Sequence, residues 1–277
     1  MFIEAILLEE IFLDTEYFTD GEYEKAFTEF GGFRKKIVEK IYSILPTKPN
    51  LILDFLSGHG FFGAEMALKF PDARIIGTGL INDVSSFRQV RRSKSFPQKI
   101  WTNFAYIECD VTNLPLKSTS CDLVVNFLGL EDLNMTRDKT GVELALDEIY
   151  RVTKPDGLIQ ISYVDYGDAP EEVLAREIWE NIGLNAIFYD RDDYISLLIK
   201  HHFLPIDEFE YRMHQKMTAT QAREELLFAC SEAPKVFSDF SVKALDFHNL
   251  WNKFSRPLQE HGMAFWSPIR IIISSKE

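Results

Sequence analysis

Cysteine is scarce in this chain, whose 277 residues include only Cys109, Cys121 and Cys230. Three cysteines cannot build a disulfide framework, and none has the short Cys–Cys or Cys–His spacing of a metal-binding motif. Two of the three fall inside predicted strands. We therefore interpret all three as reduced core residues and expect no metal site.

Excess positive charge and long apolar runs are also absent. The formal net charge is −13, and a surface this acidic repels phosphate backbones, which argues against nucleic-acid binding. No uncharged run approaches the roughly 18 residues that a membrane helix needs. The apolar stretch 1–13 carries three glutamates and lacks the basic region of a signal peptide. We expect a cytoplasmic protein without a membrane span, of undetermined oligomeric state.

Strand and helix patterns alternate from residue 33 onward. Apolar residues at helical spacing mark a helix over 33–45. Strands are then predicted at 51–56, 73–80, 104–110, 121–130 and 158–164, with intervening helices that include 83–95 and 142–152. This alternation predicts an α/β fold with a doubly wound, mainly parallel sheet. In such sheets ligands bind at the carboxyl ends of the strands, where the strand order reverses.

The remaining pattern completes a seven-stranded sheet within a single domain spanning 1–277. A sixth strand is predicted at 203–213 and a last one at 267–275, so the α/β core comprises 47–217 and 267–277. Residues 218–266 form a predicted helical insertion, which opens on the capping box Thr218-x-x-Gln221. Residues 1–46 form an N-terminal helical region, whose aromatic residues predict either a face packed on the core or a lid over the site.

The segment Leu53–Gly63, LDFLSGHGFFG, carries the strongest local signal. A buried strand delivers Asp54 to its carboxyl end, and the glycines that follow let a ligand approach the backbone before a helix begins. Gly58, Gly60 and Gly63 also satisfy G-x-G-x-x-G, the fingerprint of nicotinamide dinucleotide binding. That cofactor requires an acid at the end of the second strand, where this chain has glycine and leucine.

Two further motifs follow in order, ECDVTNLPLKSTSCDLVV and LDEIYRVTKPDGLIQIS. With the glycine loop before them, they make the chain resemble the class I S-adenosylmethionine-dependent methyltransferases, in particular the small-molecule and lipid group (methyltransferase type 11-like). The resemblance covers about 33–217 and the last strand. It implies S-adenosylmethionine as cofactor and methyl transfer by in-line displacement to a small, partly apolar acceptor, the one partner that we expect.

The resemblance also implies the cofactor-binding residues. Those around the methionine part are Asp54, Leu56, Ser57, Gly58, His59 and Gly60. Gly79 and Leu80 end the second strand, Asp110 hydrogen-bonds the adenine amino group beside the Val111 amide, and Asn126 and Phe127 form the floor beneath the sulfonium. The turn Lys154–Gly157, Pro115 and Asp122 are assigned structural roles.

Two departures from the family pattern leave alternatives open. Leu56 replaces the first glycine of the loop, and Gly79 replaces the ribose-binding acid, for which Asn82 or Asp83 could substitute. No histidine has the spacing of a general base, so the catalytic residues and the acceptor atom are not assigned. Besides an active methyltransferase, the sequence allows a scaffold that keeps the fold without turnover, or an NAD-dependent oxidoreductase.

Overall fold

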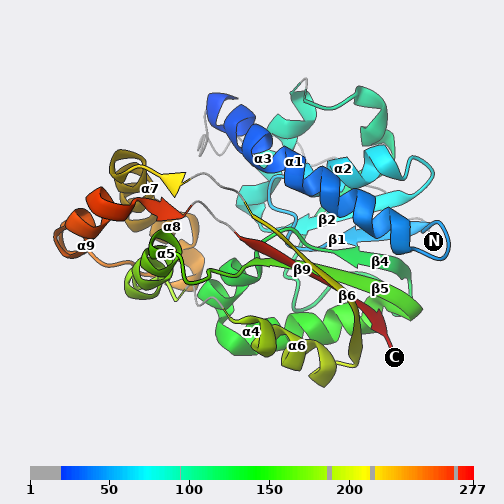
Figure 1. Ribbon diagram of the computed structural model, residues 1–277. Coiled ribbons are helices and arrows are strands. Elements are labelled where there is room, and N and C mark those ends of the chain that lie inside the picture. The colour runs from blue at the N-terminus through cyan, green and yellow to red at the C-terminus, as the bar shows by residue number, and fades with distance from the viewer. Residues whose placement is uncertain (1–19, 94, 186–188, 213–215, 265–267) are drawn as a thin grey trace.

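A seven-stranded sheet forms the centre of the computed structural model (Figure 1). The structure describes residues 20–93, 95–185, 189–212, 216–264 and 268–277, with side chains from residue 32 onward. The strands are β1 (Leu51–Asp54), β2 (Arg74–Gly79), β3 (Phe104–Glu108), β4 (Cys121–Val125), β5 (Thr153–Val164), β6 (Phe203–Tyr211) and β9 (Ile269–Lys276). Their order is β3-β2-β1-β4-β5-β9-β6. Only β9 runs antiparallel to its neighbours in this sheet, which confirms the predicted doubly wound, mainly parallel sheet.

Both faces of the sheet are buried. Along β1, Ile52 packs into the core on one face and Leu53 into the core on the other, because successive side chains of a strand point to opposite faces. The strands therefore read as continuous apolar runs rather than alternating ones. The three isoleucines in a row on β9, Ile271–Ile273, follow the same rule.

Helices cover each face (Figure 1). On one side lie α1 (Asp20–Ile44), α2 (Phe61–Lys69) and α3 (Ile81–Arg92), followed by the short 3-10 helix η1 (Gln98–Thr102). On the other side lie α4 (Leu130–Val152) and α6 (Arg191–Lys200). The helix predicted at 142–152 begins twelve residues earlier than expected, at Leu130, and continues through a non-helical residue, Asp138. The strand predicted at 121–130 accordingly ends at Val125.

A third apolar cluster lies beyond the end of the sheet, at the left of Figure 1. It joins α5 (Pro170–Asn181), α7 (Ala219–Ser231) and α9 (Phe247–His261), with α8 (Ala233–Val236) and the 3-10 helix η2 (Ser238–Phe240) between the last two. The predicted capping box is present at the start of α7. The sequence did not predict a two-stranded antiparallel sheet of β7 (Lys216–Met217) and β8 (Met263–Ala264), which ties the two ends of this segment together.

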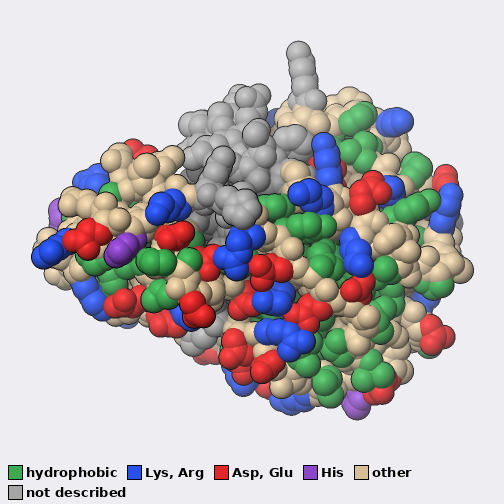
Figure 2. Space-filling view, in the orientation of Figure 1, with side chains coloured by type: hydrophobic (Ala, Val, Ile, Leu, Met, Phe, Trp, Pro, Cys, Tyr) green, Lys and Arg blue, Asp and Glu red, His purple; other side chains and the backbone are tan. Residues whose placement is uncertain are grey.

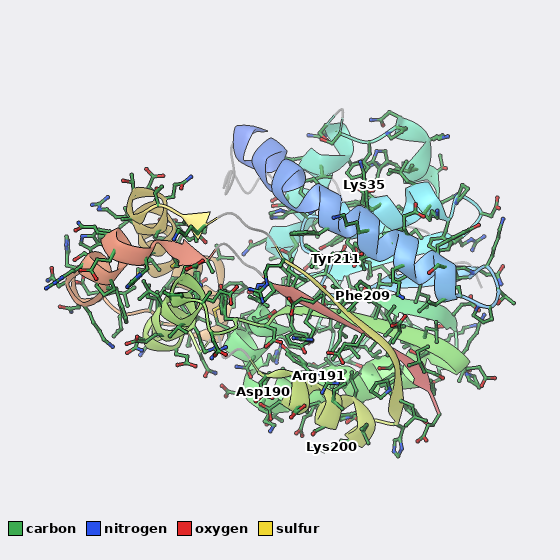
Figure 3. All side chains as sticks on the ribbon, viewed as in Figure 1. Lys35, Asp190, Arg191, Lys200, Phe209 and Tyr211 are labelled. Carbon is green, nitrogen blue, oxygen red and sulfur yellow. The ribbon has the colours of Figure 1, made fainter. Side chains whose placement is uncertain are left out.

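Helix α1 packs along β6, the edge strand (Figure 3). Phe33 stacks on Tyr211 with ring centroids 5.7 Å apart, and Lys40 forms an ion pair of 2.7 Å with Asp207. Phe33 is thus packed on the core, as one of the two interpretations predicted. The side chains of Phe18, Tyr23, Phe27 and Phe30 lie outside the described residues.

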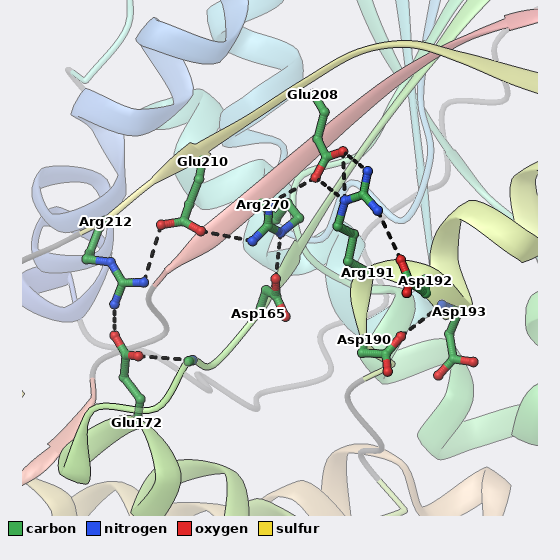
Figure 4. Close-up of polar contacts among 11 residues, drawn as sticks. Asp165, Glu172, Asp190, Arg191, Asp192, Asp193, Glu208, Glu210, Arg212 and Arg270 are labelled. Carbon is green, nitrogen blue, oxygen red and sulfur yellow. Dashed lines mark hydrogen bonds and ion pairs between the residues drawn. The ribbon is translucent and has the colours of Figure 1, made fainter.

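Ion pairs join the last strands to the helices beside them (Figure 4). Arg270 on β9 binds Asp165 at 2.5 Å and Glu208 at 2.9 Å, and Arg191 on α6 binds the same glutamate. Arg212 pairs with Glu172 and so extends these ion pairs to α5. Such networks fix side chains that already share a partner, so each further pair loses little additional conformational entropy.

Acidic and basic side chains are interspersed on the face shown in Figure 2, so the net negative charge does not gather there in one patch. Among the residues that the structure describes, no helix combines the length and the apolar character needed to cross a membrane.

Candidate functional site

The strand order reverses between β1 and β4, and Asp54 stands at that point. Asp54 is paired in register with Val125, so the carboxyl ends of both strands open at the same edge of the sheet. The buried Asp54 carboxylate accepts hydrogen bonds through Oδ2 from the Ser57 hydroxyl (2.5 Å) and the Gly63 amide (2.8 Å). Its Oδ1 atom has no hydrogen-bond partner. The carboxylate thus anchors the loop and the first turn of α2 and keeps one oxygen unused.

The loop between β1 and α2 contains three residues with positive φ. Gly58 and Gly60 have φ of 50° and 81°, a region that glycine enters at no steric cost. Leu56 has φ of 51°, which is costly for a side chain with a Cβ atom. The position at which the family pattern has glycine therefore keeps the glycine conformation although it carries leucine.

A cavity of about 500 Å³ opens beside this loop. Asp54, Leu56, Ser57, Gly58 and His59 line it from the loop, and Phe127 lines it from the end of β4. Arg34, Phe61 and Phe62 contribute from α1 and α2. Toward the helical segment beyond the sheet, the cavity continues between Glu131, Asp132, Met135, Trp179, Leu184, Glu225 and Phe228.

A smaller cavity, of about 110 Å³, lies past the ends of β2 and β3. Gly79, Leu80, Asp110 and Val111 line it from the sheet, and Val236, Phe237 and Phe240 line it from the segment after α7. Eight residues belong to the walls of both cavities: Leu56, Gly58, Asn82, Asp83, Gly129, Asp132, Val236 and Phe237. Together the two cavities form one elongated site, with Leu56 and Gly58 where they meet.

Gly79 leaves room for two other polar groups. A Cβ atom on this residue would lie 2.2 Å from Tyr106 Oη and 2.6 Å from Asp83 Oδ2, both far inside van der Waals contact. Asp83 reaches this place from α3, where its Oδ2 also accepts a 2.8 Å hydrogen bond from the Leu80 amide. The missing acid at the end of β2 is thus replaced in space by a carboxylate from the next helix.

Asp110, just after β3, has partners for both of its carboxylate oxygens. Oδ1 accepts hydrogen bonds from the Thr112 amide (3.0 Å) and hydroxyl (2.7 Å), and Oδ2 forms an ion pair with Arg137 of α4. The Arg137 guanidinium also lies 5.1 Å from the centre of the Phe240 ring. Each carboxylate oxygen has two lone pairs, so Oδ2 retains the capacity to accept one further donor.

Burial changes the protonation of several groups in the site. It raises the pKa of Asp54 to about 7 against the opposing hydrogen bonds from Ser57 and Gly63. The pKa of Asp132, an exposed residue, is also raised, by desolvation and by the negative charges of Glu131 and Asp83. Desolvation lowers the pKa of His59 to about 4, so this imidazole is neutral at physiological pH.

Part of this chain is similar in sequence to known proteins. Residues 53–161 match the family model described as "Methyltransferase domain". A malonyl-[acyl-carrier protein] O-methyltransferase from Methylovorus sp. (strain MP688) is 24% identical over 195 residues, which are 69% of this chain and 62% of that protein. The alignment thus spans less than two thirds of the relative. Residues 53–161 of this chain thus correspond to a methyltransferase domain.

Solved structures show the same fold around that methyltransferase domain. The MccD protein superimposes with a TM-score of 0.57 at 16% identity, over 88% of this chain and 97% of that one. The [4+2]-cyclase SpnF gives a TM-score of 0.57 at 14% identity, over 87% of this chain and 80% of that one. One of these neighbours is named for a chemistry other than methyl transfer, so the fold by itself does not fix the reaction.

The methyltransferase domain brings most of the predicted site residues together. Ten of the twelve line the two cavities, and the exceptions are Gly60 and Asn126. Gly60 packs against the ring of Phe87 instead, since a Cβ atom there would lie 2.6 Å from that ring. Asn126 is fully buried, and its side-chain amide donates to the carbonyl oxygens of Phe55 (3.1 Å) and Leu128 (3.3 Å). Both residues shape the loop and turn around the site without lining the cavities.

Other residues that line the two cavities were not predicted. Arg34 belongs to an amphipathic helix that the sequence marks only by its apolar positions, and Glu131 lies directly after the segment predicted as strand, 121–130. Glu225, Phe228 and Phe237 come from the predicted insertion, more than 160 residues after the loop that they face. Their position follows from tertiary packing, for which a single sequence carries no local signal.

The residues assigned structural roles behave accordingly. The Asp122 carboxylate accepts hydrogen bonds from the Asn50 and Leu51 amides at 3.0 and 2.9 Å, and it binds Lys154 at 2.6 Å. It therefore fixes the entry of β1 against β4 and β5. Asp156 has φ of 60°, and the register of β4 with β5 shifts here, so the predicted turn at 154–157 is a local irregularity within β5.

Proposed function

We propose that the protein is an S-adenosylmethionine-dependent methyltransferase whose cofactor lies along the two joined cavities, with the acceptor in the remainder of the larger one. The observation that carries this proposal is the continuity of the site. One elongated space runs from Asp110 and Val111, past the glycine loop, to Phe127, and a nucleoside joined to an amino acid has this extended form.

The charges of the site fit the cofactor. S-adenosylmethionine supplies an electrophilic methyl group on a positively charged sulfur, and it also carries an ammonium group. The buried Asp54 Oδ1 atom lacks a hydrogen-bond partner, and a buried carboxylate oxygen left in this state is costly unless a donor binds it. Asp83 and Asp132 add negative charge to the same walls. The lining thus favours a cationic ligand.

Each part of the cofactor has a candidate partner among the chain's own residues. Asp110 would accept the adenine amino group, with the Val111 amide beside the ring. Asp83 would bind the ribose hydroxyls in place of an acid at position 79. Arg34, buried against Phe61 with its guanidinium carbon 5.1 Å from the ring centre, would bind the methionine carboxylate. Phe127 would form the floor near the sulfur.

The protein's contribution to methyl transfer is chiefly placement. Displacement at a methyl carbon needs the acceptor atom in line with the bond that breaks, and holding both partners in one water-poor cavity supplies much of the rate. Phe61, Phe62 and Trp179 keep the larger cavity apolar. An apolar lining of this kind favours a small, partly apolar acceptor.

One observation favours a second candidate, a protein that binds the cofactor or keeps the fold without turnover. Leu56 stands where the family pattern has glycine, and its side chain lies at the junction of the two cavities. A leucine there narrows the passage that the cofactor would occupy.

A calorimetric titration of the purified protein with S-adenosylmethionine, S-adenosylhomocysteine and NAD tests the proposal. We expect both sulfur compounds to bind with one site per chain and NAD not to bind. Binding of the two sulfur compounds without methyl transfer to any acceptor would favour the second candidate. Binding of NAD alone would contradict both and restore the oxidoreductase interpretation.

A further inference from the structure

The larger cavity has two unlike halves. The loop and Phe127 form the half assigned above to the cofactor. The other half lies between α4, α5 and α7, where Met135, Trp179, Leu184 and Phe228 make an apolar and aromatic wall. Trp179 is 4% exposed and Phe228 is 39% exposed, so this wall runs from the packed interior to the surface. An acceptor bound here must present an apolar body.

Two carboxylates stand in that apolar half, Glu131 from the first turn of α4 and Glu225 from α7. Asp132, next to Glu131, lines both cavities and so lies between the two halves of the site. Glu131 is 7% exposed. Its Oε2 atom accepts a 3.1 Å hydrogen bond from the Gly129 amide, whereas its buried Oε1 atom has no hydrogen-bond partner. A carboxylate oxygen in this situation is stabilised by a ligand that donates a hydrogen bond or carries positive charge.

Positive charge in the described lining of the larger cavity comes from a single side chain, Arg34. It lies on the opposite face of the sheet from α4, within 5.7 Å of the centre of the Phe127 ring and in the field of Glu65. No described lysine or arginine lines the cavity beside Glu131, Asp132 or Glu225. A carboxylate acceptor placed in this half would face three acids, and no lysine or arginine among the described lining residues lies there to bind it.

We infer that the acceptor carries a basic nitrogen, as a primary or secondary amine attached to an apolar body, and that Glu131 binds it. This inference rests on the proposed function. An ammonium group satisfies the free Glu131 oxygen and is stabilised by aromatic rings as well as by carboxylates. To accept a methyl group the nitrogen must first lose a proton, and the neighbouring Asp132 carboxylate can take it. That transfer leaves a neutral amine with a free electron pair and a neutral carboxylic acid.

The test compares ligands that share a body and differ in the head group. Calorimetry on the protein saturated with S-adenosylhomocysteine would measure 2-phenylethylamine against 3-phenylpropanoate, and tryptamine and octylamine against the corresponding carboxylates. We expect at least one amine to bind with a Kd at least tenfold lower than that of its matched carboxylate. Tighter or equal binding of every carboxylate, or no binding of any amine, would overturn the inference.

Substitutions assign the effect to the acids. Glu131→Gln keeps the size of the side chain and an acceptor for Gly129 but removes the charge, so amine binding should weaken at least tenfold while the Kd for S-adenosylhomocysteine stays unchanged. Glu224→Gln, on the exposed face of α7, is the matched control and should change neither. Unaltered amine binding by Glu131→Gln would overturn the assignment of that residue.

If Glu131→Gln fails to fold, Glu225→Gln gives the second measurement, because Glu225 comes from a different helix of the same wall. This variant should weaken amine binding severalfold, and an unchanged Kd for the amine would count against the inference.

Saturating the protein with S-adenosylhomocysteine at the start separates this inference from the proposed function. Failure of S-adenosylhomocysteine to bind the unaltered protein would contradict the proposed cofactor, whereas binding of the cofactor product without amine preference contradicts only this inference.

Discussion

The hydroxyl of Tyr106 on β3 donates a 2.7 Å hydrogen bond to the backbone carbonyl oxygen of Gly58 in the loop after β1. The ring of Tyr106 is stacked on Phe87 of α3, with centroids 4.5 Å apart. This contact holds the glycine loop from the neighbouring strands, and it passes through the space that Gly79 leaves without a side chain. Position 79 therefore requires glycine, because a side chain there would collide with the tyrosine that holds the loop.

Gly79→Ala should destabilise the fold. The new Cβ would approach Tyr106 Oη to 2.2 Å, and overpacking in a filled site costs about 1–3 kcal/mol of unfolding free energy. Adding Tyr106→Phe removes the hydroxyl that collides and should recover part of the loss. Urea unfolding of the unaltered protein, Gly79→Ala and the double variant measures this. Equal stability of Gly79→Ala and the unaltered protein would show that the two groups do not share this space.

Leu56 limits the passage between the two cavities. Leu56→Ala and Leu56→Gly should both bind S-adenosylhomocysteine severalfold more tightly, because each removes the side chain at the junction. Only glycine also relieves the positive φ of 51°, so it should be about 1 kcal/mol more stable than alanine at this position. Calorimetry and urea unfolding separate the two effects. An unchanged Kd in both variants would mean that leucine does not obstruct the cofactor.

Arg34 should recognise the amino-acid end of the cofactor and not its nucleoside. Arg34→Gln is expected to raise the Kd for S-adenosylhomocysteine about tenfold, since a hydrogen bond to a charged group contributes about 1.5–3 kcal/mol. The Kd for 5′-methylthioadenosine, which lacks the carboxylate, should change less than twofold. Lys35→Gln, at the exposed neighbouring position labelled in Figure 3, serves as the control. Equal losses for both ligands would indicate a general disturbance of the site.

The buried Asp54 makes stability depend on pH. Its pKa is about 7 in the folded protein against an ordinary value of 3.8, so the folded state keeps a proton that the unfolded state releases. The free energy of unfolding should therefore decrease as the pH rises from about 4 to about 7. Asp54→Asn cannot titrate, and its stability should fall less over this interval. Parallel curves of unfolding free energy against pH for the two proteins would show that Asp54 does not cause the pH dependence.

Much of the fold could be predicted from the sequence because its signals are local. Apolar runs of strand length, broken by Pro and Gly, marked all seven strands of the central sheet, and the aspartate that ends β1 located the loop. The errors in the predicted elements lie where a short apolar run fits either a strand or the start of a helix. The residues 126–130 were predicted as strand, but the structure turns at Gly129, with φ of 132°, and starts α4 at Leu130.

The site was predictable only on the side built by neighbouring strands. Asp54, Asp110 and Phe127 meet because the carboxyl ends of parallel strands share one edge. The opposite wall depends on how α7 and η2 fold back, and Asn82 of α3 fixes that segment through a 3.1 Å hydrogen bond to the Val236 carbonyl. A contact between residues 154 positions apart follows from tertiary packing and leaves no trace in local patterns.

The central claim is that the joined cavities hold an adenosyl sulfur compound. A crystal structure of the protein with S-adenosylhomocysteine tests it most directly. The account predicts adenine beside Asp110 and Val111, ribose against Asp83, and the sulfur near Phe127. Electron density for the nucleoside at any other place, or a Leu56 side chain that closes the junction with the ligand outside it, would contradict the account.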